Sequence, residues 1–394
     1  MNIVLFALGV GIVSLLLVIS REIEEKLDKN QAGIGMVVGA KGSPLQLILC
    51  AVFHIDFPTG NIKLKDTAFL KKHPLVSQVI PQALGDSYQT FRIVGTNHDY
   101  VRLYDAKIQE GELWKEDMEV TIGVGVAQKT GLKIGSTFAG AHGMTDGGDA
   151  HDHTMFKVTG ILAPTGTVID QLILTNIESI WEVHQHHEEE KKDSLLHNKE
   201  EIHEKHIEEA NDEDREITTM LVKFRSPLGA IQLPRFINEN TALQAATPAF
   251  EISRLFSLIG VGINTLNGLA YLIMLVSGLS VFISLFSSLK ERKYELAYIR
   301  VIGAKKSQLF GMIILEGILL SFLGYVVGIA LSHVTIWILS QNIEDSFHQS
   351  FDYHRFLIEE FYLLISSLIL GILASLTPAI QAFKTDISKT LAEG

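Results

Sequence analysis

The sequence predicts an integral membrane protein with four transmembrane α-helices and an α+β extracytoplasmic domain between the first helix and the second. Three observations lead to this fold class. Four apolar blocks each reach the length of about 20 residues that a helix needs to cross about 30 Å of hydrocarbon. The loops that join these blocks differ sharply in charge. The long segment between the first two blocks contains strand patterns separated by turn residues.

The four apolar blocks are candidate spans because irregular chain would leave backbone groups unpaired in hydrocarbon. A core helix of a soluble protein could explain one block, but four blocks favour membrane spans. A secretory signal peptide is the alternative for the first, which lacks basic residues before its apolar run and a small-residue cleavage pattern after it. We therefore expect it to be retained, with a slightly truncated start. The spans cover residues 1–20, 255–289 (with the end of a stalk), 307–340 and 361–383.

Lysine and arginine predict the orientation of these spans. Residues 290–306 carry six basic and two acidic side chains, whereas residues 341–360 carry one basic and five acidic side chains. The first of these loops is therefore expected to be cytoplasmic and the second external. Both termini, including the tail 384–394, would then be cytoplasmic, and residues 21–254 would form the external domain. Glu316 is the one buried charge expected in the spans, so we predict no polar translocation path.

The external domain is expected to be α+β. Its single cysteine, Cys50, excludes an intramolecular disulfide, so the domain must be held by its own core. Short runs rich in β-branched and apolar residues, bounded by glycine, proline or aspartate, predict strands at residues 91–94, 120–124, 156–162 and 171–175. Short helices are predicted at residues 69–73 and 178–184.

Two low-complexity inserts interrupt this domain, at residues 140–153 and 184–216. The first is rich in glycine, aspartate and histidine without periodicity, so residues 140–148 are predicted to be a loop. The second is predicted to be an exposed helix or a disordered tract. Fourteen acidic and five basic residues lie between positions 182 and 216, and this balance argues against nucleic-acid binding.

Nine of the fifteen histidines lie between positions 142 and 206. Imidazole with nearby carboxylate suits Zn²⁺, Ni²⁺ or Cu²⁺. The spacing matches no fixed metal motif, however, and histidine also accumulates as polar filler in exposed inserts, so both interpretations stay open. The candidate metal ligands are His142, His151, His153, His184, His186, His187, His203 and His206.

The cytoplasmic segment 290–306 carries the strongest functional pattern. On a helix, Leu296, Ile299 and Val301 would form an apolar side, and Gly303 would end the helix. An amphipathic helix against the inner leaflet is one interpretation, although membrane-inserting aromatic residues and a strongly basic face are not pronounced. A helix that docks into a groove of a cytoplasmic partner fits at least as well.

This segment, Glu291-Arg-Lys-x-Glu295-Leu-Ala-x-Ile-Arg300-x-Ile-Gly303-Ala304, resembles the coupling-helix signature of the FtsX/MacB/LolCDE-type (type VII) ABC transporter permeases. Residues 376–391 are similar to the family's closing P-A-x-x-A…D-P-x-x-x-L element, and residues 124–135 to an external v-A-x-x-l-G-l-k-v-G-d segment. Two features depart from the family: basic residues are missing before the first span, and the histidine-rich inserts are additions.

The resemblance implies a MacB-like periplasmic core domain in a protein of the bacterial cytoplasmic (inner) membrane. Two permease subunits, as a homodimer or as paired permeases, would assemble with a dimer of cytoplasmic ABC ATPase subunits that bind the ATP. ATP-driven closure would move the spans and change the external domain, which is mechanotransmission. The implied coupling residues are Glu291, Arg292, Glu295, Leu296, Ile299, Arg300 and Gly303.

Enzymatic activity is not expected, because the chain has no G-x-x-x-x-G-K-[ST] loop and no H-E-x-x-H or G-x-S-x-G motif. The segment Gly39–Gln46 is similar to that of histidine-bearing permeases associated with zinc-handling systems. One hypothesis is therefore a permease subunit for zinc-related transport or lipoprotein handling, with an extracytoplasmic binding protein or lipoprotein as partner. The alternative is a non-transporting FtsX-like mechanotransmitter that regulates an external enzyme or a signalling partner.

Overall fold

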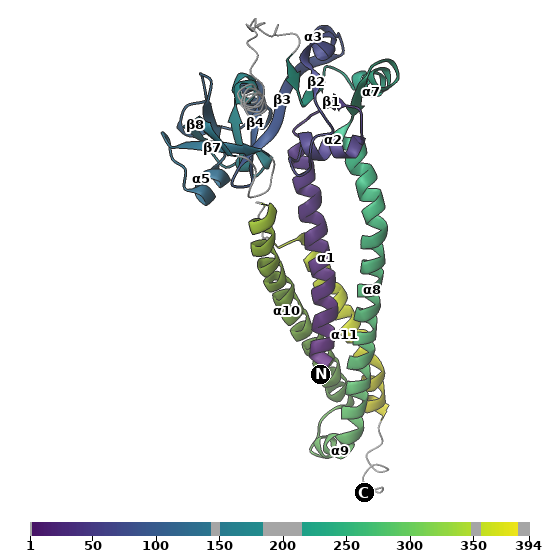
Figure 1. Ribbon diagram of the computed structural model, residues 1–394. Helices are drawn as coiled ribbons and strands as arrows, with labels where there is room; N and C mark the ends of the chain where they lie inside the picture. Colours follow the sequence, from purple (N-terminus) through teal and green to yellow (C-terminus); the bar gives the residue numbers. More distant parts are fainter. Residues whose placement is uncertain (1, 143–149, 184–214, 348–355, 385–394) are drawn as a thin grey trace, which may run out of the picture. The chain divides into compact units, whose positions relative to one another are not determined.

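The computed structural model describes residues 2–142, 150–183, 215–347 and 356–384 (Figure 1). The chain divides into two compact units. Lys26–Phe256 form the sheet unit, and Met1–Glu25 together with Ser257–Gly394 form the helical unit.

In the described part of the sheet unit, strands are joined into one ten-stranded mixed sheet. Strand β7 (Thr137–His142) lies off the main path and pairs with β3 and β8. The β4–β9 and β6–β8 pairs are parallel, and the other pairs are antiparallel. A separate two-stranded sheet joins β2 (Ile62–Lys63) and β10 (Glu216–Ile217). The main order is β12 (Leu243–Ala246), β1 (Met36–Ala40), β11 (Thr219–Phe224), β3 (Val76–Tyr88), β4 (Phe91–Gly95), β9 (Leu172–Thr175), β6 (Glu119–Ile122), β8 (Ala150–Leu162) and β5 (Ile108–Gly111).

Both faces of this sheet are buried, because successive side chains of a strand point to opposite sides. In β1, Met36 and Val38 belong to one apolar cluster and Val37 to another; in β4, Ile93 and Val94 divide in the same way. The helices α3 (Ala68–Lys72), α5 (Val124–Thr130) and α7 (Pro227–Asn240) and a helix over residues 177–183 pack on the first cluster. The helices α2 (Pro44–Ala51) and α4 (His98–Leu103) and the 3₁₀ turn η2 (Val168–Gln171) pack on the second. The 3₁₀ turn η1 (Leu64–Thr67) precedes α3.

The predicted strands 91–94 and 156–162 are confirmed as parts of β4 and β8. The predictions 120–124 and 171–175 overlap β6 and β9, but residues 123–124 lie beyond β6 and residue 171 belongs to η2. Both predicted short helices are present, over Ala68–Lys72 and over residues 177–183. The predicted loop over residues 140–148 is wrong at its start. Residues 140–142 belong to β7, and residues 150–153 of the same insert belong to β8. The glycine-rich composition did not predict this pairing, in which Phe138 opposes Phe156 and the strands continue beyond them.

A buried polar pair involves Tyr100, a member of the second apolar cluster of the sheet unit. The His54 Nε2 atom lies 2.9 Å from the Tyr100 hydroxyl, and both side chains are buried. Burial, reinforced by the charge of Arg92, holds the pKa of His54 well below its ordinary value. Cys50 is a buried free thiol, and burial raises its pKa.

We predict that the sheet unit loses stability when the pH falls below the ordinary histidine pKa of 6.5. The unfolded chain takes up a proton at His54 in this range, whereas the folded chain holds the ring neutral, so protonation favours unfolding. Lowering the pH from 7.5 to 5.5 should remove roughly 1 kcal/mol through this residue. Thermal unfolding of the full chain in detergent checks this, with His54→Gln expected to show a smaller loss. An equal loss in both proteins would contradict the assignment to His54.

The helical unit contains α1 (Asn2–Gln31), α8 (Pro248–Glu291), α9 (Lys293–Val301), α10 (Lys306–Phe347) and α11 (Ile358–Lys384), of which α1 and α8 continue into the sheet unit. Within the described residues, α1, α8, α10 and α11 are long and apolar enough to cross a membrane. Figure 1 shows these four long helices. They contain the four predicted spans from residue 2 onward, and they pack around a shared apolar cluster that includes Phe6, Ala270, Ile329 and Leu363.

Small residues let the long helices approach closely, as is usual where helices cannot gain from the hydrophobic effect. On α10 and α11, a Cβ atom added to Gly317 would lie 2.6 Å from the Ser375 Cβ atom and 2.8 Å from the Gly371 oxygen. On α1 and α10, a Cβ atom added to Gly328 would lie 2.7 Å from the Ala7 oxygen. Neither site has room for a side chain.

Glu360 ties three of these helices together at one end of the unit. Its Oε1 atom accepts a hydrogen bond from the Ser14 hydroxyl of α1 at 2.7 Å and lies 3.1 Å from the His333 Nε2 atom of α10. Its Oε2 atom accepts the Leu357 backbone N–H at 3.1 Å, the reach-back contact of a glutamate in the first turn of a helix. The Tyr325 hydroxyl donates to the Glu360 backbone oxygen at 3.1 Å.

This cluster corrects the prediction that Glu316 is the one buried charge of the spans. Glu360 is 1% exposed, whereas Glu316 is only partly buried. The charge count had assigned Glu360 to the external loop 341–360, but α11 begins at Ile358 and carries Glu360 into the packed helices. Charge counting cannot detect a carboxylate whose partners lie on distant helices.

We predict that Glu360→Ala destabilises the helical unit by about 3 kcal/mol, because it removes the buried acceptor that the Ser14 hydroxyl and the His333 ring share. Glu360→Gln should cost less, since its amide oxygen can still accept one of these bonds. The midpoint of thermal unfolding of the full chain in detergent measures both losses. The neighbouring Glu359→Ala, at a residue that is not buried, serves as control; a comparable loss there would refute the specific role of Glu360.

Candidate functional site

A short helix, α9, joins the two long helices α8 and α10. Helix α8 ends at Glu291, Arg292 leaves the helical conformation, and α9 begins at Lys293. At its other end the Gly303 N–H donates to the Arg300 oxygen and the Ala304 N–H donates to the Ile299 oxygen, at 3.1 and 3.2 Å. This is the Schellman arrangement, and Gly303 adopts a φ of 117° that favours glycine. The prediction that Gly303 ends the helix is confirmed.

Helix α9 has two different faces. Lys293, Leu296, Ala297 and Arg300, spaced as helical neighbours, lie against the ends of the long helices and line a cavity. The exposed side of this segment carries an apolar patch of four residues, which we call the outer patch. Its members and their exposed fractions are Tyr294 (43%), Tyr298 (61%), Val301 (61%) and Ile302 (87%).

The predicted apolar side of α9 is therefore divided between these faces. Leu296 lines the cavity, whereas Ile299 and Val301 are exposed, at 42% and 61%. Five residues of helix correspond to a rotation of about 140°, so Leu296 and Val301 cannot share one face.

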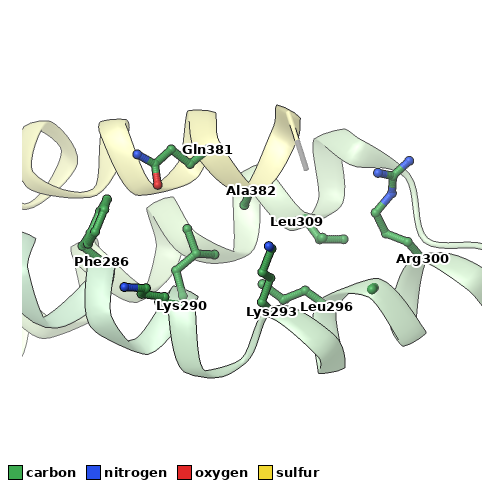
Figure 2. A pocket seen from close by; sticks show the side chains of 10 residues that line it. Phe286, Lys290, Lys293, Leu296, Arg300, Leu309, Gln381 and Ala382 are labelled. Atoms are coloured by element: carbon green, nitrogen blue, oxygen red, sulfur yellow. The ribbon is translucent and has the colours of Figure 1, made fainter. Parts of the chain in front are cut away.

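The cavity between α8, α9, α10 and α11 has a volume of about 260 Å³. In Figure 2, Gln381 and Ala382 come from α11 on one side, and Lys290, Lys293 and Leu296 come from α8 and α9 opposite them. Its lining is Phe286, Leu289, Lys290, Lys293, Leu296, Ala297, Arg300, Leu309, Gln381 and Ala382.

Charge in this lining has one sign. Lys290, Lys293 and Arg300 are its basic members, and no described aspartate or glutamate lines the cavity. Lys290 and Lys293 are exposed, and Arg300 is partly buried. The remaining lining is apolar except for Gln381. The cavity can therefore accept a group that combines negative charge with apolar surface.

The seven residues predicted for coupling do not form one surface. Leu296 and Arg300 line the cavity, Glu295 and Ile299 are exposed on α9, and Glu291, Arg292 and Gly303 lie at its boundaries. Sequence reasoning included Val301 but missed the other three residues of the outer patch, although the spacing of Tyr294 and Tyr298 by one helical turn was visible. It also did not assign Leu309, Gln381 and Ala382 to this site, although Gln381 and Ala382 lie in the segment 376–391 that resembles the family's closing element.

The predicted metal ligands are not tested by the structure. His184, His186, His187, His203 and His206 lie outside the described residues, and only the backbone of His142, His151 and His153 is described, in β7 and β8. Among the side chains that the structure does describe, no group of three or more histidine, cysteine, aspartate and glutamate residues could hold a metal ion.

Comparison with known families places two models on the chain. Residues 1–226 match the MacB-like periplasmic core domain, and residues 267–387 match the FtsX-like permease C-terminal family. No curated protein matches the chain.

Two solved structures are similar to part of the chain. The periplasmic region of MacB from Actinobacillus actinomycetemcomitans is 12% identical with a TM-score of 0.34, over 58% of this chain and 97% of that one. The extracellular domain of the noncanonic ABC-type transporter YknZ from Gram-positive bacteria is 14% identical with a TM-score of 0.30, over 54% of this chain and 99% of that one.

Proposed function

Because the chain belongs to the FtsX/MacB-like family of ABC transporter permeases, we propose that it is a permease subunit that couples ATP hydrolysis by a separate ATPase to movement of its sheet unit. The observation that carries this proposal is α9, a short, sharply ended helix whose outer patch is exposed between two long apolar helices. The resemblance of residues 291–304 to the family's coupling helix supports the same role.

The outer patch has the composition of a protein-docking surface. Tyrosine is enriched among residues that dominate binding energy, and an apolar helix face can lie in the groove of a partner. Tyr298 and Ile302 lie one turn apart and are 61% and 87% exposed, so a partner could bury most of both side chains. We propose that this partner is the cytoplasmic ATPase.

The proposed orientation in the membrane follows from the basic residues of the segment 290–306. Helices α1, α8, α10 and α11 would cross the cytoplasmic membrane, with α9 and both termini on the cytoplasmic side and the sheet unit outside. Helices α1 and α8 contain residues of both units, so their movement would be passed along the chain to the sheet unit.

The sheet unit would perform the external task. Zinc-related transport or lipoprotein handling is the task we propose, in a dimer of permeases with a dimer of ATPases. The alternative is a non-transporting regulator of an external enzyme or signalling partner, which would also be driven by ATPase movement received at α9. The side chain of Glu360 is buried and already contacts Ser14 and His333. This supports a mechanism in which the helices move rather than one in which a substrate follows a polar path through them.

We predict that Tyr298→Ala combined with Ile302→Ala lowers recovery of the ATPase at least tenfold, because truncating a central residue of an interface commonly costs 2 kcal/mol or more. Copurification of the ATPase with the tagged full chain measures this loss. Glu295→Ala should also uncouple the permease from the ATPase, which would be measured as a loss of permease-stimulated ATP hydrolysis.

Leu275→Ala is the matched control, because Leu275 is 65% exposed on α8, outside the proposed docking surface. Recovery of the ATPase should be unchanged in this variant. Undiminished recovery with the Tyr298 and Ile302 changes would refute the docking assignment.

We also propose that the histidine-bearing inserts bind Zn²⁺ weakly. Support comes from the sequence: nine histidines lie between positions 142 and 206, many of them close to acidic residues. Neutral imidazole and carboxylate are ordinary zinc ligands.

We predict that isothermal titration of the full chain in detergent with Zn²⁺ gives heat above buffer, and that deleting residues 142–153 and 184–206 removes it. Binding should weaken below about pH 6.5, because a histidine must lose its proton to bind the metal. Titration with Mg²⁺ serves as control. No heat from the intact chain, or equal heat from the deletion variant, would rule out this proposal.

A further inference from the structure

The cavity beneath α9 has a chemical character that the proposed coupling role does not use. Its basic members, Lys290, Lys293 and Arg300, lie beside an apolar lining from four helices. An exposed apolar track leads away from it along α8. Leu279, Ile283 and Phe286 are spaced by four and three residues, so they share one face, and they are 54%, 56% and 36% exposed. Phe286 belongs both to this track and to the cavity lining.

We propose that this cavity binds the headgroup of an anionic phospholipid, with an acyl chain lying along the track of Leu279, Ile283 and Phe286. The proposal rests on the proposed membrane placement of the helical unit, and it is independent of the ATPase. Basic residues at the cytoplasmic surface attract anionic lipids, and pockets between helices on that side can hold their headgroups.

Charge and shape together favour this occupant over others. A free phosphate would pair with the lysines but gain nothing from the apolar lining. An apolar helix from another protein would bring no negative charge to a lining that contains Lys290, Lys293 and Arg300. The volume of about 260 Å³ is below that of a typical cavity for a whole drug-sized ligand, so it suits a headgroup whose chains lie outside.

The bound lipid would join α9 to the long helices. Lys293 and Arg300 belong to α9, Lys290 and Phe286 to α8, and Ala382 to α11. An anion between them would hold α9 in place while leaving the outer patch exposed. The lipid composition of the inner leaflet would thereby regulate how firmly α9 transmits a movement.

Native mass spectrometry of the delipidated full chain tests the proposal. The chain is titrated in detergent with phosphatidylglycerol or with phosphatidylcholine carrying the same acyl chains. The first lipid should bind more tightly. Lys290→Gln and Lys293→Gln should each weaken its binding roughly fivefold, since one basic residue near an anionic surface contributes about that factor. Lys293→Arg keeps the positive charge, so it should bind phosphatidylglycerol as tightly as the unchanged chain.

Lys305→Gln is the matched control, because Lys305 is an exposed lysine of the same loop outside the cavity. It should leave phosphatidylglycerol binding unchanged. Lipid binding is compared only among variants whose thermal unfolding midpoints equal that of the unchanged chain. Equal binding of the two lipids, or an equal loss in Lys305→Gln and Lys293→Gln, would overturn the site. Full displacement of the lipid by inorganic phosphate would identify a free anion as the occupant and would overturn the proposal. A large increase in phosphatidylglycerol affinity on removing residues 385–394 would identify the C-terminal segment as the occupant and would overturn it as well.

Discussion

The close approach of α10 and α11 determines the geometry of the helical unit. Two helices surrounded by lipid gain little from burying apolar side chains against each other, so their association depends on packing and on polar contacts. Gly317 and Gly371 face each other where an added Cβ atom would meet backbone or serine atoms. This contact brings Leu309 of α10 and Ala382 of α11 to one end of the unit, where α8 and α9 complete the cavity.

The two ends of the helical unit differ in how they are held. At one end, Glu360 joins α1, α10 and α11 through buried hydrogen bonds. At the other end, about 33 Å along α11 by the rise of a helix, Ala382 lines a cavity with exposed lysines. The end at Glu360 is suited to stay fixed, and the end with the cavity is suited to bind a partner or a lipid. This difference supports the proposed role of α9 as the part of the permease that receives movement from the ATPase.

Helix α9 separates two kinds of chemistry on opposite sides. The outer patch is aromatic and aliphatic, and the inner face carries Lys293 and Arg300 beside Leu296. A partner on the outer side and an anion on the inner side would therefore not compete for the same residues. The Schellman ending at Gly303 fixes the length of α9 and so the position of both faces.

Much of this architecture follows from short-range patterns in the sequence. Apolar blocks predict the long helices, bounded β-rich runs predict the strands of the sheet unit, and Gly303 predicts the end of α9, because each pattern depends on neighbouring residues. The burial of Glu360 and the convergence of Phe286, Leu309 and Ala382 depend on helices far apart in the chain. Only tertiary packing brings such residues together, and only it decided which side of α9 faces inward.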